Sequence, residues 1–326
     1  MRQVSPLLRF LVRLVLLAAF LALVAAALLT RDGFTRWQTS AYPVTEASFH
    51  TWDEVFAHPG PVTVETLVTG FIDMNRCDNL DQSNPSVASC RSPEPLLDLA
   101  HLVHHSRLGV YLIDSGFATQ FAASPPYGNY SLAMQLFNRM LGVRNGQRPH
   151  QSVAEILRER HQQPRAVFFT HLHPDHTSGA ADLPADLDYV FGKAEVGFLA
   201  RVAVGSHLAA KPRLRTLDYT GIRGMAPLGP AVDLLGDGSL WAISTPGHTP
   251  GHTSYLVNSD PPMLLVGDAS HFAWAFEHDI APRAWTSGDG AHAVESLVEL
   301  RRFALQYPRV RMVFGHEVGF LGLQKL

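Results

Sequence analysis

The sequence has few cysteines, no surplus of positive charge and no repetitive tract. Only Cys77 and Cys90 occur among 326 residues, and they do not form a CxxC pair, so a zinc-finger type of thiolate site is excluded. Basic and acidic residues nearly balance, 26 against 29, and the formal charge of −3 argues against a nucleic-acid partner held by a broad basic face. The hydrophobic content, 46%, is that of a globular protein rather than a disordered one.

Histidine, by contrast, is abundant, with 17 copies in the chain. Imidazole binds zinc, iron and manganese, and it titrates near neutral pH. The composition therefore favours imidazole chemistry over thiolate chemistry. The length of the chain is compatible with one large domain or two ordinary ones.

An apolar segment stands at the N-terminus. Residues 14–29 carry no charge, and three arginines precede them. About 20 apolar residues can cross a bilayer, and the basic flank predicts a cytoplasmic N-terminus with the rest of the chain exported. Segment 1–30 is expected to be a membrane anchor, favoured by the unbroken apolar run, or a signal peptide with an Ala-x-Ala site at 25–27. The protein would then face the periplasm from the bacterial inner membrane, or be exported after cleavage.

The remaining chain divides into a short connection and one long domain. Residues 31–61 have mixed composition with three prolines and predict a linker, and residues 62–326 predict the folded domain. Within its first polar stretch, Cys77 and Cys90 are either two free thiols or a disulfide. Export to an oxidising compartment favours the disulfide.

Short apolar runs alternate with segments of helical pattern along this domain. Strands are predicted at 62–72, 108–113, 166–169, 240–244, 263–266 and 310–314. Helices are predicted at 131–141, 152–161 and 291–307, and the first two start at a serine that can cap them. Strands interleaved with helices indicate a layered α/β domain.

One polar motif follows the strand at 166–169. The stretch THLHPDH contains His171, His173, Asp175 and His176. Two histidines separated by one residue in an extended chain project to the same side, and the turn at the proline can bring the last two side chains to a second point. One short loop thus offers two pairs of ligands, enough for two adjacent metal ions.

Three further polar residues complete the candidate set. His248, Asp268 and His316 each follow an apolar run, and a glycine stands directly before each of them. Side chains at the ends of several strands can converge on one point. Five histidines and two aspartates without a thiolate suit two zinc ions first, and iron or manganese would also suit them.

The pattern HxHxDH, followed by single His, Asp and His residues in that order, resembles the metallo-β-lactamase superfamily from residue 96 to the end. The resemblance implies a four-layered αββα sandwich with a dinuclear zinc-type site. It implies that His171, His173 and His248 hold the first ion, that Asp175, His176 and His316 hold the second, that Asp268 bridges both, and that Asp114 supports the site loops.

Within the superfamily, the stretches HLHPDHTSG, STPGHTPGHTSYLV, GDAS and FGHE are most similar to N-acyl homoserine lactonases. True β-lactamases usually place a cysteine in the second site, and glyoxalase II adds a C-terminal domain for which the ten residues after His316 leave no room. The resemblance implies quorum quenching, in which a metal-bridging hydroxide opens the lactone. Asp175 would then carry a proton to the leaving oxygen, Asp268 would take part through both ions, and His271, which stands in place of the lactonase tyrosine, would hydrogen-bond the substrate.

Three points stay open at this stage. The substrate is expected to be a small lactone, but another ester, a thioester or a phosphodiester would suit the same site, and a non-catalytic binding protein is a third alternative. Phe272, Trp274 and Phe276 alternate after the metal loop and form either a wall for an acyl chain or part of the core. The sequence does not define the oligomeric state.

Overall fold

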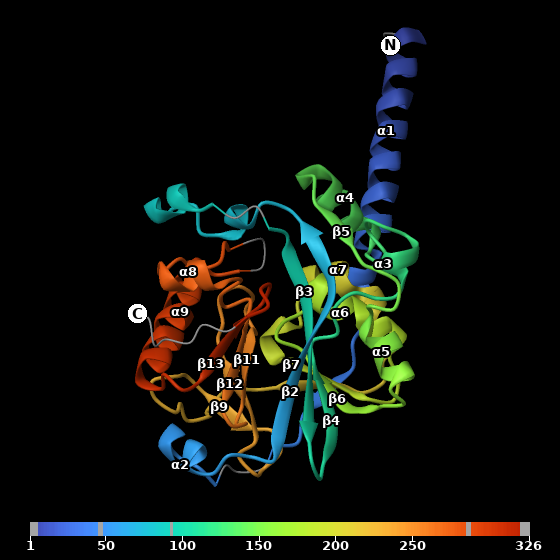
Figure 1. Ribbon diagram of the computed structural model, residues 1–326. Helices are drawn as coiled ribbons and strands as arrows, with labels where there is room; N and C mark the ends of the chain where they lie inside the picture. The colour runs from blue at the N-terminus through green and yellow to red at the C-terminus, as the bar shows by residue number, and fades with distance from the viewer. Residues whose placement is uncertain (1–5, 45–47, 92–93, 285–287, 320–326) are drawn as a thin grey trace.

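Two mixed β-sheets form the body of the protein (Figure 1). The computed structural model describes residues 6–44, 48–91, 94–284 and 288–319. Within these residues, eight strands form the larger sheet in the order β1-β8-β7-β6-β4-β3-β2-β5, and five form the smaller sheet in the order β13-β12-β11-β10-β9. The strands of the larger sheet are β1 (Thr39–Ala41), β2 (Val62–Asp73), β3 (Leu96–His105), β4 (Gly109–Ile113), β5 (Arg144–Gly146), β6 (Pro164–Phe168), β7 (Asp188–Gly192) and β8 (Leu214–Leu217). Those of the smaller sheet are β9 (Ala231–Asp233), β10 (Leu240–Ser244), β11 (Thr253–Val257), β12 (Met263–Gly267) and β13 (Arg311–Phe314).

The helices range from single turns to one long N-terminal rod. The α-helices are α1 (Pro6–Thr30), α2 (Trp52–Ala57), α3 (Gln120–Ala123), α4 (Leu132–Leu141), α5 (Val153–Glu159), α6 (Pro174–Thr177), α7 (Phe198–Leu208), α8 (Ala273–Glu277) and α9 (Gly290–Gln306). Short 3-10 turns are η1 (Arg31–Phe34), η2 (Arg76–Asn79), η3 (Pro85–Ser89), η4 (Ser178–Asp182) and η5 (Lys193–Glu195).

Three buried apolar clusters hold these layers together. The first lies between the sheets, where Phe168 and Val190 of the larger sheet meet Tyr255 and Leu265 of the smaller. The second lies between the smaller sheet and α9 with α2, and the third between the larger sheet and α5 with α7. Strands that are covered on both faces, such as β10 with the sequence LWAIS, therefore consist of consecutive apolar residues.

The strands and helices expected from apolar patterning are confirmed to within a few residues. The strand predicted at 240–244 is β10, and the helix predicted at 291–307 is α9. The serine caps are also confirmed: the Ser131 hydroxyl accepts a bond from the Met134 N–H at 3.3 Å, and Ser152 caps α5 in the same way.

Segment 31–61 is not a simple linker, because it adds a strand to the larger sheet and a helix that packs against the smaller sheet. β1 pairs in parallel with β8, and α2 buries Trp52 and Val55 beneath α9. The Trp52 indole N–H donates to the Met225 carbonyl at 2.7 Å. A capping box of Thr51 and Glu54 starts α2, and its T-x-x-E spacing in the sequence indicates the start of a helix.

The N-terminal helix α1 projects away from the body (Figure 1). The span 14–34 has a mean hydropathy of 2.4, and its apolar side chains are not buried inside the protein. By length and composition such a helix fits either a membrane span or a signal sequence. Its last turn continues directly into η1, which packs on α7.

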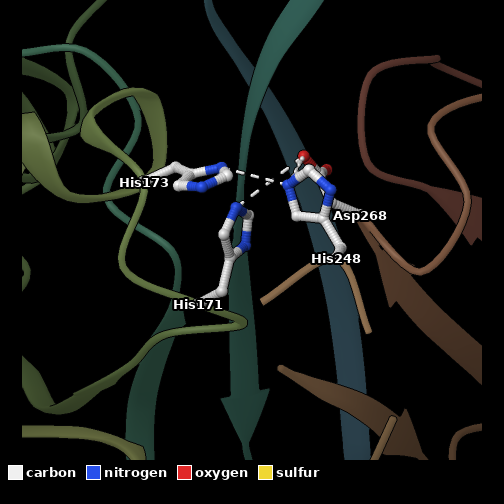
Figure 2. A group of neighbouring side chains, drawn as sticks. All are labelled: His171, His173, His248 and Asp268. Atoms are coloured by element: carbon white, nitrogen blue, oxygen red, sulfur yellow. Dashed lines mark hydrogen bonds and ion pairs between the residues drawn. The ribbon is translucent and has the colours of Figure 1, made fainter. Parts of the chain in front are cut away.

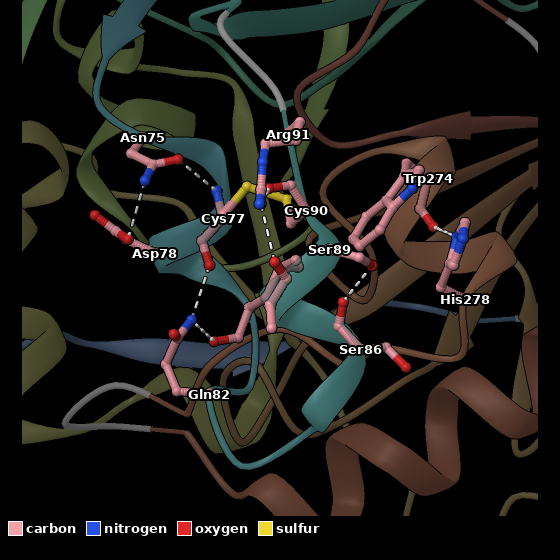
Figure 3. The surroundings of a disulfide bond; sticks show 12 residues. Asn75, Cys77, Asp78, Gln82, Ser86, Ser89, Cys90, Arg91, Trp274 and His278 are labelled. Carbon is pink, nitrogen blue, oxygen red and sulfur yellow. Dashed lines mark hydrogen bonds between the residues drawn. A yellow bond between two sulfur atoms is a disulfide. The ribbon is translucent and has the colours of Figure 1, made fainter.

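A disulfide closes the loop between β2 and β3 (Figure 3). Cys77 and Cys90 are joined with their Cα atoms 5.9 Å apart. The Gln82 side-chain amide donates to the Cys77 carbonyl at 2.8 Å, and Leu80 of the same loop packs against Phe272. The loop is thus fastened both to itself and to the segment that follows the β12 strand.

Candidate metal centre

The residues expected as ligands meet where several strands end between the two sheets (Figure 2). His171 and His173 come from the loop after β6, His248 from the loop after β10 and Asp268 from the end of β12. The ligand atoms of these four residues all lie within 4.8 Å of one another. The His248 Nε2 atom is 3.0 Å from His173 Nδ1 and 3.3 Å from Asp268 Oδ2.

A second group of possible ligands also lies beside Asp268. The ligand atoms of Asp175, His176 and His316 also lie within 4.8 Å of one another. The His176 Nε2 atom is 3.6 Å from Asp268 Oδ1, and the His316 Nε2 atom is 3.2 Å from Asp268 Oδ2. The Asp268 carboxylate therefore touches both groups.

The chemistry of these residues fits a pair of divalent metal ions. Among the described residues, the buried atoms His171 Nε2, His176 Nε2 and Asp268 Oδ1 have no hydrogen-bond partner. A buried polar atom without a partner is costly, and a bound cation would satisfy all three. The donor set consists of nitrogen and oxygen atoms without thiolate, which suits zinc, iron or manganese.

Neighbouring charges set the protonation of these side chains. Burial raises the pKa of the Asp268 carboxyl, but His316 and His271 outweigh burial and hold that pKa well below its usual range. Burial lowers the pKa of His316, yet the Asp268 carboxylate overrides it and raises that pKa to about 9. Burial and the nearby imidazoles hold the pKa of His171 well below its usual value, so His171 is neutral, as metal coordination requires.

Asp114 braces the loop that carries the first ligands. It is buried at a φ of 55°, and its two oxygens accept bonds of 2.8 Å from the N–H and the hydroxyl of Thr170. Its Oδ2 atom also lies 2.8 Å from His176 Nδ1. A hydrogen bond at Nδ1 leaves His176 Nε2 free to coordinate a metal.

Two further buried residues support the centre, and the sequence reasoning missed both. Glu195 accepts bonds from the Leu172 N–H at 2.9 Å and the Gly251 N–H at 2.7 Å, so one carboxylate holds two ligand loops together. His252 accepts a 3.0 Å bond from the Asp268 N–H. The repeated TPGH motif pointed to His252, whereas no local pattern marks Glu195.

An apolar cavity of about 570 Å³ starts at the centre. His173 and Asp175 line its inner end, and its walls come from α4, α7 and the end of β2. This volume lies in the range of pockets that take small organic ligands. His271 does not line the cavity; its Nε2 atom lies 3.3 Å from Asp268 Oδ2.

Of the two alternatives for the three aromatic residues after the metal loop, the structure shows packing inside the protein rather than a wall of the cavity. Phe272 packs with Leu80 beneath the disulfide loop, with Trp274 beside it, and the Phe276 ring lies 5.2 Å from that of Phe314. None of them lines the cavity. The expectation assumed alternation, but α8 is helical, so every second residue points in a different direction.

Comparisons with known proteins identify the family. A family model described as the metallo-beta-lactamase superfamily matches residues 99–316. The chain therefore belongs to this superfamily. The expected α/β fold is confirmed, and its two sheets are mixed.

Known proteins are similar to this chain over different shares of its length. An N-acyl homoserine lactonase of a Bacillus species is 27% identical over 266 residues, which cover 79% of this chain and 95% of that protein. Two fungal γ-lactamases, FDB1 of Fusarium pseudograminearum and MBL2 of Gibberella moniliformis, are 33% identical over 143 residues. The match covers 38% of this chain and only 34% and 58% of their own lengths. A solved quorum-quenching N-acyl homoserine lactone hydrolase shares the fold, with a TM-score of 0.58 at 16% identity over 80% of this chain and 95% of that one.

We predict that Glu195→Gln weakens metal binding. A glutamine offers one acceptor oxygen where two N–H groups need one each, so the loops of His173 and His248 lose their common support. Loss of such a support lowers metal affinity by roughly tenfold to a hundredfold. Competition for zinc with a chromogenic chelator measures the change, and Glu159→Gln on the surface of α5 is the matched control. Equal affinities in both variants would contradict the prediction.

We predict that His207 makes the free energy of unfolding fall at acid pH. It is buried on α7, where its Nδ1 atom lies 3.0 Å from the Thr177 hydroxyl of the metal loop, and burial lowers its pKa to about 4. In the unfolded chain a histidine has a pKa of about 6.5, so between this pH and about 4 the His207 imidazole is protonated in the unfolded state but not in the folded state. The free energy of unfolding is therefore unaffected by His207 titration above pH ~6.5. It falls by up to ~3 kcal/mol as the pH is lowered towards about 4.

Urea unfolding at a series of pH values tests this dependence. The free energy of unfolding of His207→Gln is expected to fall less steeply between pH 6.5 and 4 than that of the native protein. The side chains of the candidate centre are the same in both proteins, so the difference isolates His207. The exposed His292→Gln serves as the control, and parallel curves for all three proteins would rule the effect out.

Proposed function

We propose that this protein is a metal-dependent hydrolase that opens the ring of N-acyl homoserine lactones at a dinuclear, zinc-type centre. The observation that carries the proposal is the position of Asp268, whose carboxylate lies between 3.2 and 3.6 Å from histidines of both ligand groups, beside an apolar cavity. His171, His173 and His248 would hold one ion, Asp175, His176 and His316 the other, and Asp268 both. When bound, the ions supply a hydroxide nucleophile near neutral pH and stabilise the developing negative charge.

The side chains of this chain have separate tasks in that reaction. Asp175 is partly exposed at the inner end of the cavity, where its carboxylate can carry a proton to the leaving alkoxide. His271 stands in the position of the lactonase tyrosine and can hydrogen-bond the substrate from the Asp268 side. The apolar cavity excludes water and takes up the acyl chain. A thioester is the second candidate substrate, which a local match of 41% identity over 90 residues to a hydroxyacylglutathione hydrolase of Acidiphilium cryptum favours.

We further propose that α1 is a retained anchor, which places the domain on the periplasmic side of a bacterial inner membrane. Its apolar stretch continues to Leu29 without a polar region before a cleavage site. The disulfide between Cys77 and Cys90 suits an oxidising compartment. Both observations support export of the folded domain.

Substitution of the bridging carboxylate is predicted to abolish turnover. Asp268→Asn keeps the size of the side chain but removes the negative charge shared by both ligand groups, so kcat should fall by at least ~10³-fold. Acid release from N-decanoyl homoserine lactone in a weakly buffered solution measures it. Chelation of the native protein should have the same effect, and added zinc should restore the rate. Turnover at the native rate in Asp268→Asn would contradict the assignment of the metal centre.

A second variant tests the cavity as the acyl-chain site. Ala203 of α7 lines the cavity, so Ala203→Phe would fill part of it. We expect kcat/KM for the decanoyl lactone to fall by about tenfold or more, while the butanoyl lactone changes little. Ala209→Phe, at the exposed end of α7, is the matched control. An equal loss for both chain lengths would place the acyl chain elsewhere.

A further inference from the structure

Two neighbouring helices expose a row of large apolar side chains, which we call the α4–α7 face. Leu132, Leu136 and Met140 follow one another at intervals of four residues along α4, and Met140 is 84% exposed. Phe198 and Leu199 at the start of α7 are also exposed. Single exposed apolar residues are ordinary, but a row on adjacent helices marks an interaction surface.

The N-terminal helix leaves the body at this same face (Figure 1). Its continuation η1 is fixed to α7: the Arg201 Nε–H donates to the Gly33 carbonyl at 2.9 Å, and the Phe34 ring meets the Phe198 ring at 5.3 Å. The end of α1 also lies against α4. A bilayer crossed by α1 would therefore lie directly over the α4–α7 face.

The charge of the segment that contains α4 suits an anionic lipid surface. Residues 115–154 contain no aspartate or glutamate and three arginines, although the whole chain has a formal charge of −3. These arginines, Arg139, Arg144 and Arg148, are all exposed. Apolar side chains combined with arginines are typical of surfaces that lie in the headgroup layer of anionic membranes.

The mouth of the cavity lies in the same surface. Leu141 of α4 and Phe198 and Leu199 of α7 are exposed and also line the cavity, whose inner end is formed by His173 and Asp175. The path from the metal centre to the surface thus runs between the two helices. Leu136 and Met140 are exposed on α4 without lining the cavity.

We propose that the α4–α7 face rests in the headgroup layer of an anionic bilayer, so that the cavity opens to lipid and receives the apolar chain of its substrate from the membrane. The inference rests on the proposed hydrolase function and on a retained α1. The substrates would then be amphiphiles with long acyl chains that are dissolved in the membrane. The partner of the domain would be the lipid surface.

Fluorescence in reconstituted vesicles tests the docking independently of activity. The described residues contain no free cysteine, so Met140→Cys in the full chain can be labelled with an environment-sensitive dye. In vesicles of phosphatidylethanolamine and phosphatidylglycerol, we expect a blue-shifted emission that brominated lipids quench and aqueous iodide does not. Leu305→Cys, on the exposed surface of α9, is the control and should be quenched by iodide alone.

Two results would overturn the proposal. Equal quenching of both labels by iodide would mean that the α4–α7 face stays in water. A label at Met140 that is shielded from iodide but is not quenched by brominated lipid would mean that a second copy of the chain, rather than the bilayer, covers α4.

Hydrolysis rates of a long-chain and a short-chain lactone test whether the docked face delivers substrate from the lipid. With decanoyl lactone dissolved in the vesicles, Leu136→Glu combined with Met140→Glu should lower the rate about tenfold, because carboxylates are costly in the lipid interface. The butanoyl lactone in water should react at the native rate, and Leu305→Glu should change neither. Decanoyl rates equal to native would contradict entry from lipid. A lipid-quenched label on a protein inactive towards every lactone would refute the proposed function but not the docking.

Discussion

Five imidazole rings place a nitrogen within 3.8 Å of the Asp268 carboxylate, which is 2% exposed. A carboxylate at this depth is tolerated only while positive charge surrounds it, whether from protonated imidazoles or from metal ions. The backbone must approach closely to allow this arrangement. A Cβ atom on Gly315 would lie 2.1 Å from Asp268 Oδ1, so only glycine lets the ends of β12 and β13 meet here.

The two sheets are joined directly beneath this carboxylate. The Tyr255 hydroxyl of β11 donates to the Phe169 carbonyl at 2.8 Å, and the Thr253 N–H donates to the Thr170 carbonyl at the same distance. Both acceptors stand immediately before His171 in the chain. Because hydrogen bonds within the protein set the position of the metal loop, the ligands are held in place by the scaffold as well as by any ion they bind.

The sequence predicted what depends on local spacing and missed what depends on contacts between distant segments. His171, His173, Asp175 and His176 stand in one short loop whose spacing itself indicates two ligand pairs, and the structure brings them together with the three single ligands. Glu195 carries no such signal, because its two partners lie in other loops.

Two features depend on a helical period that a short stretch of sequence does not reveal. The aromatic residues at 272, 274 and 276 alternate in the sequence, but residues 273–277 form a helix, and of the two alternatives, substrate wall or core, the structure shows packing inside the protein. The prolines of segment 31–61 predict a linker, whereas Trp52 and Val55, three residues apart, form the buried face of α2. The walls of the cavity come from α4, α7 and β2, so that no single stretch of sequence could have indicated them.

The junction between α1 and η1 has a kinetic consequence for a chain anchored in a bilayer. Thr30 is followed directly by η1, which is hydrogen-bonded to α7, so no flexible tether separates α1 from the domain. In a chain anchored in this way, the domain could not swing away from the surface to sample bulk solution. Its encounter rate with a lipid-dissolved substrate would then be governed by the two-dimensional density of that substrate in the membrane, and dilution of the membrane with inert lipid would slow the reaction.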